Sequence, residues 1–474
     1  MISKMKPQLN IILAILVCLG FAACESYVDI KTQGKLVPGE ISNYRYLLNN
    51  TSAYEVGPRL PDIASDDVEL VDGSTQQLAL SVSDSYAYWT KSYTWQAVIY
   101  PIGTYQADYD WNAMYNTVTY SNVVINEVPT STGGTESEKA ALIGEALVHR
   151  ADAYLMLVNK YAKPYNASTA TSDLGVPMVL IQTTVQSLKR PSIQAVYDQI
   201  ITDLKTAIPA LPLTQLYNTL PSKPSAYGEL ARTYLCMNDY ANAKLYADSA
   251  LLYRSTLNDL SAITALSSTT YPMRSSDPEI LLSKITYGGL STYTPSALRL
   301  SSSLLVLLGT KDQRYTLFTT VPATIVSSYT TAGGRFFCKD KFLNESRNIG
   351  PSVPEMMLIE AEYYARNNQP DVSMSWVNAL RKKRFKAADY TALLAIDSND
   401  ALKKVIDERH REFFCRMLRW WDMRRLKDDA MFAETLTRTV AGVTYTLAPT
   451  SNRYVFSIPD YQILLSPEIE QNPE

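Results

Sequence analysis

The densest group of aromatic side chains in this sequence lies between residues 86 and 105. A flat aromatic ring can pack against the apolar C–H face of a sugar, while carboxylates, amides and arginines bond its hydroxyl groups. The loop before this stretch adds two adjacent carboxylates. A packing role in a helical core is the alternative for any single ring. The residues predicted here to contact a ligand are Asp66, Asp67, Tyr86, Tyr88, Trp89, Tyr93 and Trp95.

These residue types do not combine into a catalytic site. A glycosidase needs two carboxylates that face each other across the scissile bond. Asp66 and Asp67 are neighbours, and on an extended segment neighbouring side chains point in opposite directions. The only histidines, His149 and His410, give little support to a Ser-His-Asp triad or a histidine-rich metal site. We expect no enzyme activity, no cofactor and no metal, and a surface glycosidase with a hidden carboxylate pair is the alternative.

The N-terminus has the pattern of an exported protein. Lys4 and Lys6 precede an apolar run, residues 11–19, which is far shorter than the ~20 residues that cross a bilayer as a helix. Small residues follow, and the run Leu-Gly-Phe-Ala-Ala-Cys, ending at Cys24, resembles a bacterial lipobox. We predict a lipoprotein signal peptide over residues 1–23, acylation of Cys24, and a tether over residues 24–40. A plain signal peptide followed by a chance cysteine is the alternative.

Composition restricts the class of partner. The formal net charge of −3 argues against nucleic acid. Cys236, Cys338 and Cys415 form an odd and widely spaced set, so we predict no disulfide framework. The chain has 33 tyrosines against 10 phenylalanines and 6 tryptophans. Tyrosine has an apolar body and a polar tip, so it suits wet sugar-binding or peptide-binding surfaces, although helical repeats also use it for packing.

Apolar residues recur at helical spacing through most of the chain. Helices are expected over residues 108–128, 135–163 and 192–211, with a capping box from Thr135 and Glu138 and an N-cap at Ser192. Residues 227–251 fit the tetratricopeptide pattern, and residues 357–383 fit it more weakly. Each unit is a helical hairpin that must stack on neighbours to bury its apolar face.

Residues 255–350 differ in character from the helical segments. They are rich in serine, threonine, glycine and tyrosine, and they contain short β-like runs at residues 319–331 and 334–342. We therefore predict a mainly α protein. Its tetratricopeptide-like helical repeat scaffold spans about residues 105–252 and 354–428, and a loop-rich insertion with short β-strands spans about residues 255–350.

The most specific motif lies near the C-terminus, at residues 408–425, and reads ERHREFFCRMLRWWDMRR. It resembles the C-terminal signature of the SusD/RagB family of outer-membrane nutrient-binding lipoproteins. His410 replaces a family arginine, and Arg416 and Met417 stand where the family often has Glu-Gly. Arginines matched with carboxylates on neighbouring turns predict that the motif fixes helix packing. The residues that match the signature are Glu408, Arg409, Glu412, Arg419, Trp420, Asp422, Arg424 and Arg425.

The resemblance extends, in the family's order, to the lipobox, residues 144–162, residues 173–180 and the closing QNPE. It implies one SusD-like domain over residues 41–474, anchored by lipid in the outer membrane and exposed at the cell surface. It also implies an oligosaccharide or polysaccharide ligand that is delivered to a TonB-dependent SusC-like transporter. Peptide capture within the same family is the alternative, and a repeat scaffold without a small ligand is a third class. The family's binding face draws on the N-terminal region and the insertion, which adds Arg274, Tyr287 and Tyr293 as candidate contacts.

Overall fold

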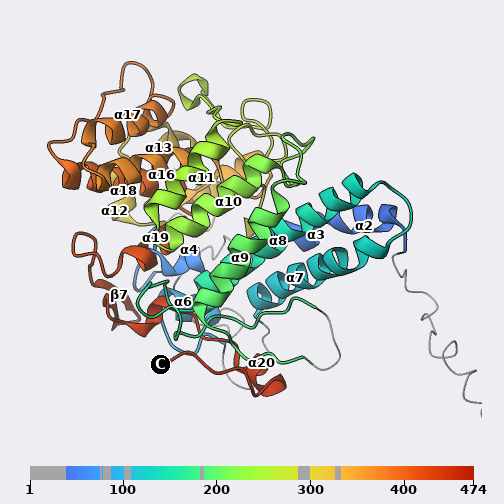
Figure 1. Cartoon of the computed structure of the whole chain (residues 1–474). Helices are drawn as coiled ribbons and strands as arrows, with labels where there is room; N and C mark the ends of the chain where they lie inside the picture. Colours follow the sequence, from blue (N-terminus) through green and yellow to red (C-terminus); the bar gives the residue numbers. More distant parts are fainter. Residues whose placement is uncertain are drawn as a thin grey trace, which may run out of the picture.

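The computed structural model describes residues 39–74, 77, 87–100, 108–181, 186–286, 299–325 and 333–473. Helices dominate these residues and the strands are short, which confirms the predicted mainly α fold (Figure 1). None of the described helices is long and apolar enough to cross a membrane. The prediction that residues 41–474 form one domain remains a prediction.

The α-helices are α2 (Ile41–Leu48), α3 (Thr51–Tyr54), α4 (Pro61–Ala64), α6 (Ala87–Tyr93), α7 (Tyr109–Glu127), α8 (Glu136–Tyr161), α9 (Ile193–Ala207), α10 (Lys223–Cys236), α11 (Tyr240–Leu251), α12 (Ser302–Leu308), α13 (Gln313–Phe318), α14 (Pro322–Ile325), α15 (Lys339–Leu343), α16 (Val353–Arg366), α17 (Pro370–Arg381), α18 (Ser398–Phe413), α19 (Leu418–Leu426) and α20 (Asp460–Leu465). The strands are β1 (Val56–Gly57), β2 (Val68–Glu69), β3 (Ile285–Thr286), β4 (Arg299–Leu300), β5 (Thr319–Thr320), β6 (Phe336–Phe337), β7 (Leu436–Val440) and β8 (Val443–Leu447).

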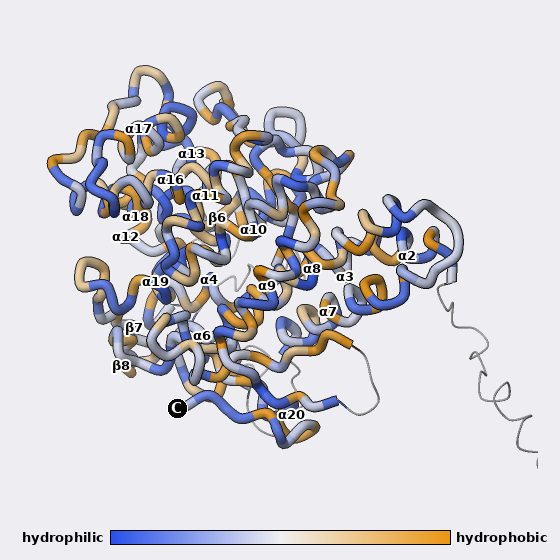
Figure 2. The backbone as a smooth tube through the Cα atoms, in the orientation of Figure 1, coloured by the Kyte–Doolittle hydropathy of each residue, from blue (hydrophilic) through white to orange (hydrophobic). Residues whose placement is uncertain are grey.

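The long helices pack against one another largely in chain order. Each of α7 to α10 packs on the helix that follows it, α11 packs on α16, and α16 packs on α17 and α18. The predicted capping box at Thr135 and the N-cap at Ser192 are both confirmed. Figure 2 shows apolar and hydrophilic residues alternating along these helices, as expected where one face of each helix is buried.

The two predicted repeats are the hairpins α10–α11 and α16–α17. Their turns contain Asn238 and Asn368 at φ 59° and 56°, a left-handed conformation that asparagine tolerates better than most residues. Between α10 and α11, the ring of Tyr246 stacks on Tyr227 and Tyr234, with centroids 6.3 and 5.5 Å apart. Tyrosine therefore fills the gap between the paired helices, and many of the 33 tyrosines serve packing.

Among the described residues, the insertion contributes strands to three of the four small sheets. Strands β1 and β3 pair in parallel and β2 and β4 antiparallel, which joins the N-terminal region to the insertion. The antiparallel pair β5–β6 falls within the two predicted β-like runs. Short helices α12 to α15 fill much of the remaining insertion and were not predicted. Three cysteines, Cys236, Cys338 and Cys415, lie buried as free thiols.

Buried ion pairs join the insertion to the C-terminal signature. Arg314 of α13 donates to Glu408 and Glu412, both at 2.7 Å. Arg381 also donates to Glu408 at 2.8 Å, and Arg384 donates to Glu412 at 2.9 and 2.8 Å. Burial opposes ionisation of the two glutamates, but these arginines outweigh it and lower the pKa of each to about 2. The signature charges therefore hold helices together, as predicted.

Replacing Glu412 tests this network. We expect Glu412→Gln to lower the free energy of unfolding at pH 7 by roughly 3–5 kcal/mol, because buried Arg314 and Arg384 each lose one of their carboxylate partners. Urea unfolding followed by circular dichroism measures the change. Exposed Glu434→Gln is the matched control and should unfold like the wild type. Equal unfolding free energies for Glu412→Gln and the wild type would contradict a stabilising role.

The same network predicts a pH dependence. An unfolded glutamate titrates near pH ~4.3, whereas folded Glu408 and Glu412 titrate near pH 2. Because the folded pKa is depressed, their contribution is complete above about pH 5 and is lost as the pH falls towards 2. We expect the unfolding free energy of the wild type to decline over this interval, and that of Glu412→Gln to decline less steeply. Parallel pH profiles would overturn the assignment.

Candidate functional site

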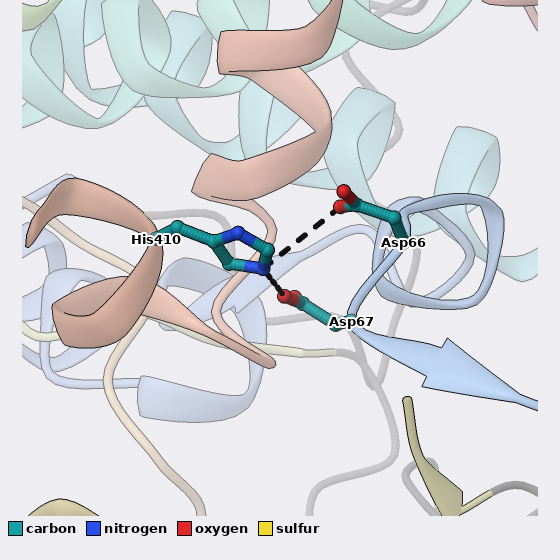
Figure 3. Close-up of side chains that lie close together, drawn as sticks. All are labelled: Asp66, Asp67 and His410. Atoms are coloured by element: carbon teal, nitrogen blue, oxygen red, sulfur yellow. Dashed lines mark hydrogen bonds and ion pairs between the residues drawn. The ribbon is translucent and has the colours of Figure 1, made fainter. Parts of the chain in front are cut away.

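Asp66 and Asp67 lie in the turn between α4 and β2, and both face His410 of α18 (Figure 3). Asp67 Oδ1 is 2.9 Å from His410 Nε2, and Asp66 Oδ1 is 3.9 Å from the same nitrogen. The expectation that the two carboxylates point in opposite directions was therefore wrong. The segment is a turn and not an extended strand at this point, so adjacent side chains converge.

The three side chains lie close enough together to resemble a metal-binding group, with ligand atoms within 4.8 Å of one another. Their oxygens, however, already have protein partners. Arg419 donates to both oxygens of Asp66 at 2.7 Å, and the backbone N–H of Cys415 donates to Asp67 Oδ2 at 2.8 Å. Burial opposes the charge of Asp66, but Arg419 and His410 outweigh it and hold its pKa below the ordinary value. These contacts are best explained as ion pairs that hold the turn after α4 against the signature motif at residues 408–425.

Arg274 is also engaged within the protein. Its side chain donates to Glu55 and Ser283, and its backbone N–H donates to Glu345 at 2.5 Å. These contacts join the insertion to the segment between α3 and β1. The structure does not bring Arg274 together with the Asp66–Asp67 pair, and its guanidinium has carboxylate partners without a ligand.

Most of the described aromatic residues in the predicted platform are buried. Trp89, Tyr93 and Trp95 are only 4–5% exposed. Trp95 donates from Nε1 to Ala64 O at 2.9 Å, and the guanidinium of Arg438 lies 4.0 and 4.3 Å from the rings of Tyr93 and Trp95. In this conformation their faces pack inside the protein, which is the alternative that the sequence left open. Cys24, Tyr86, Tyr287 and Tyr293 lie outside the described residues.

Tyr88 is the exception, because it is partly exposed and belongs to a group that joins exposed Tyr109 to the buried residues Arg59 and Tyr100. The guanidinium of Arg59 lies 5.7 Å from the ring centre of Tyr88 and 5.1 Å from that of Tyr109. Tyr109 is 49% exposed, and Tyr100 stacks on Tyr88 at 5.9 Å. We call Arg59, Tyr88, Tyr100 and Tyr109 the Arg59–tyrosine patch. Arg59 and Tyr109 were not predicted.

The patch rests on a buried charge cluster that fixes Arg59. Asp110 accepts from the backbone N–H of Arg59 at 3.0 Å and from its Nε at 3.2 Å. Lys160 of α8 donates at 2.7 Å to Asp110 Oδ2, the same oxygen that accepts from the backbone N–H of Arg59. Burial opposes the charge of Asp110, but Lys160 and Arg59 outweigh it and keep the pKa of Asp110 below its ordinary value. These contacts hold the guanidinium of Arg59 beside the rings of Tyr88 and Tyr109.

Comparisons with known proteins agree with this architecture. Residues 42–235 match a SusD-like family model described as starch-binding and associating with the outer membrane, and residues 354–474 match the model of the SusD family. No curated protein matches the chain.

Solved structures show the same fold. A SusD superfamily protein from Bacteroides vulgatus is 18% identical with a TM-score of 0.70, covering 92% of this chain and 99% of its own. One from Bacteroides thetaiotaomicron is 18% identical with a TM-score of 0.69, covering 92% and 100%. A SusD-like carbohydrate binding protein from Bacteroides vulgatus is 18% identical with a TM-score of 0.64, covering 91% and 97%. With its signature motif paired as described, the chain belongs to the SusD/RagB family.

Proposed function

We propose that the chain is a lipid-anchored protein of the cell surface that binds an oligosaccharide or polysaccharide and delivers it to a TonB-dependent SusC-like transporter. The observation that carries the glycan part is the exposed ring of Tyr109 held against a fixed guanidinium. The family model described as starch-binding and the carbohydrate binding relative support the same ligand class.

The Arg59–tyrosine patch has the parts that a sugar needs. Tyr109, which is 49% exposed, can offer its ring to the apolar C–H face of a pyranose, and partly exposed Tyr88 extends the surface. Because Asp110 and Lys160 position Arg59 beforehand, little side-chain freedom is lost on binding. Tyr88 is one of the ten residues predicted from the sequence, and this proposal keeps it as a ligand contact because its side chain is partly exposed.

Binding without catalysis is part of the proposal. A glycosidase acid needs a carboxyl group whose pKa is raised, so that it carries a proton to donate. The pKa of Asp66 is instead lowered, and Arg419 holds both of its oxygens. The Asp66–Asp67 pair therefore favours a structural role over hydrolysis.

Removing the exposed ring tests the patch. We expect Tyr109→Ala to weaken polysaccharide binding roughly three- to tenfold, because the sugar loses one stacking surface. The measurement is native affinity electrophoresis of residues 25–474 in gels containing amylopectin, dextran, xylan or galactomannan. Tyr46→Ala is the matched control, because Tyr46 is 73% exposed and lies on α2, outside the patch.

Three further results complete this test. Trp89→Ala should lower the melting temperature, since truncating a buried tryptophan costs about 3–5 kcal/mol. Equal retardation of Tyr109→Ala and the wild type would remove the patch from the ligand site. Retardation by no glycan, together with binding to a peptide mixture, would replace glycan capture by peptide capture.

The lipid anchor predicts a separate result. Cys24→Ala should move the protein from washed membranes to the soluble fraction, because the acyl chains that hold it are missing. Cell fractionation and the mass of the N-terminal peptide measure this change. Cys18→Ala is the matched control, since that cysteine lies within the predicted signal peptide. Unchanged membrane association of Cys24→Ala would contradict acylation at this residue.

A further inference from the structure

A groove of about 700 Å³ opens where four segments meet. They are the loop after α8 at residues 163–173, the turn between α10 and α11, the end of α19, and the loop after β8 at residues 450–455 (Figure 1). This volume lies within the ~300–1,000 Å³ of small-ligand clefts. The groove shares no lining residue with the Arg59–tyrosine patch or with the ten residues predicted from the sequence.

Tyrosine rings line the groove, and each is held by packing. Tyr165 is partly exposed, lies edge-on to Tyr197 with centroids 5.2 Å apart, and donates its hydroxyl to Gln194 at 2.6 Å. The ring of Tyr240 has the guanidinium of Arg366 at 4.2 Å from its centre. Because these rings are already ordered in the free protein, stacking a ligand on them costs little additional side-chain entropy.

Most charged side chains of the groove are paired with opposite charges, and Arg424, which is 2% exposed, is held by backbone carbonyls instead. At its base, Arg425 makes two hydrogen bonds of 2.7 Å with Glu362, and Arg424 donates to the carbonyl of Ala162 at 2.6 Å. Nearer the surface, Lys163 pairs with Asp173 at 2.7 Å. Lys427 pairs with Asp428, also at 2.7 Å. A strongly charged ligand would therefore have to compete with existing ion pairs, which favours a neutral one.

Two amide groups supply hydrogen-bond donors for such a ligand. The carbonyl oxygen of Asn166 accepts from Ser168, and that of Asn238 accepts from the hydroxyl of Tyr240. Among the contacts of the described residues, the Nδ2 groups of these two asparagines have no protein acceptor. Rings, free amide donors and charged side chains that are already engaged within the protein together match a neutral polyhydroxy compound.

We propose that this groove is a second glycan-binding site, which takes a neutral oligosaccharide segment on Tyr165 with Asn166 and Asn238 bonding its hydroxyls. The inference rests on the proposed glycan-binding function and extends it, because a polysaccharide that engages two sites on one chain binds by avidity.

Selective blocking of the groove tests the proposal. Thr450 lines the groove and is exposed, so Thr450→Cys in residues 25–474 places an accessible thiol there. The native Cys236, Cys338 and Cys415 are buried, so a bulky polyethylene glycol maleimide should modify the new thiol selectively. We expect the modified variant to bind the retarding polysaccharide, chosen from amylopectin, dextran, xylan and galactomannan, roughly tenfold or more weakly than the unmodified variant. Thr391→Cys, exposed and outside the groove, carries the same modification as the matched control and should bind equally before and after.

A second variant addresses the stacking surface directly. Tyr165→Ala should weaken retardation roughly three- to tenfold, measured well below the melting temperature of the variant. If Thr450→Cys binds equally before and after modification while Tyr109→Ala binds weakly, the second site is overturned and the proposed function stands. If the wild type is retarded by none of the four polysaccharides, the proposed function itself fails. Loss of peptide binding, instead of glycan binding, on modification would overturn the glycan assignment of the groove.

Discussion

Burial of charge is the constraint on which the rest of this structure depends. Moving an ion out of water costs several kcal/mol unless a partner matches it, and α18 and α19 carry Glu408, Glu412 and Asp422 in the interior. Each carboxylate accepts hydrogen bonds from at least two arginines. These arginines belong to α13, to the end of α17 and the turn after it, and to α18 and α19 themselves. The insertion and the last helices are therefore held in one charge-matched arrangement.

The N-terminal loop is held by the same kind of contact, and this decides what remains for a ligand. Asp66 pairs with Arg419, Asp67 contacts His410, and Arg274 pairs with Glu55. The charged residues that seem available in the sequence are thus engaged inside the protein. In the Arg59–tyrosine patch and in the groove beside Tyr165, the groups that remain for a ligand are tyrosine rings and amides. That distribution supports the proposal of a neutral, hydroxyl-rich ligand.

Periodic features could be predicted from the sequence, and contacts between distant segments could not. The helix caps and both hairpins follow from local spacing, so they were found. Arg59 and Asp110 are 51 residues apart, and nothing in either segment indicates their pairing. Trp89 shows the same limit, since an aromatic cluster suits a ligand surface and a core equally well. Met417 stands where the family often has glycine, and its φ is 69°. Glycine adopts this backbone conformation at lower cost than other residues, so the family's usual residue indicated the conformation at this position.

Salt dependence of glycan binding tests the central claim most directly. If tyrosine rings and amides recognise the ligand while the charges are engaged internally, the dissociation constant for the retarding polysaccharide should be the same within about twofold at 50 mM and 500 mM sodium chloride, because salt screens charge and leaves stacking intact. Calorimetric titration at the two concentrations measures this. Binding that disappears at high salt, or that occurs only with acidic polysaccharides, would contradict the account.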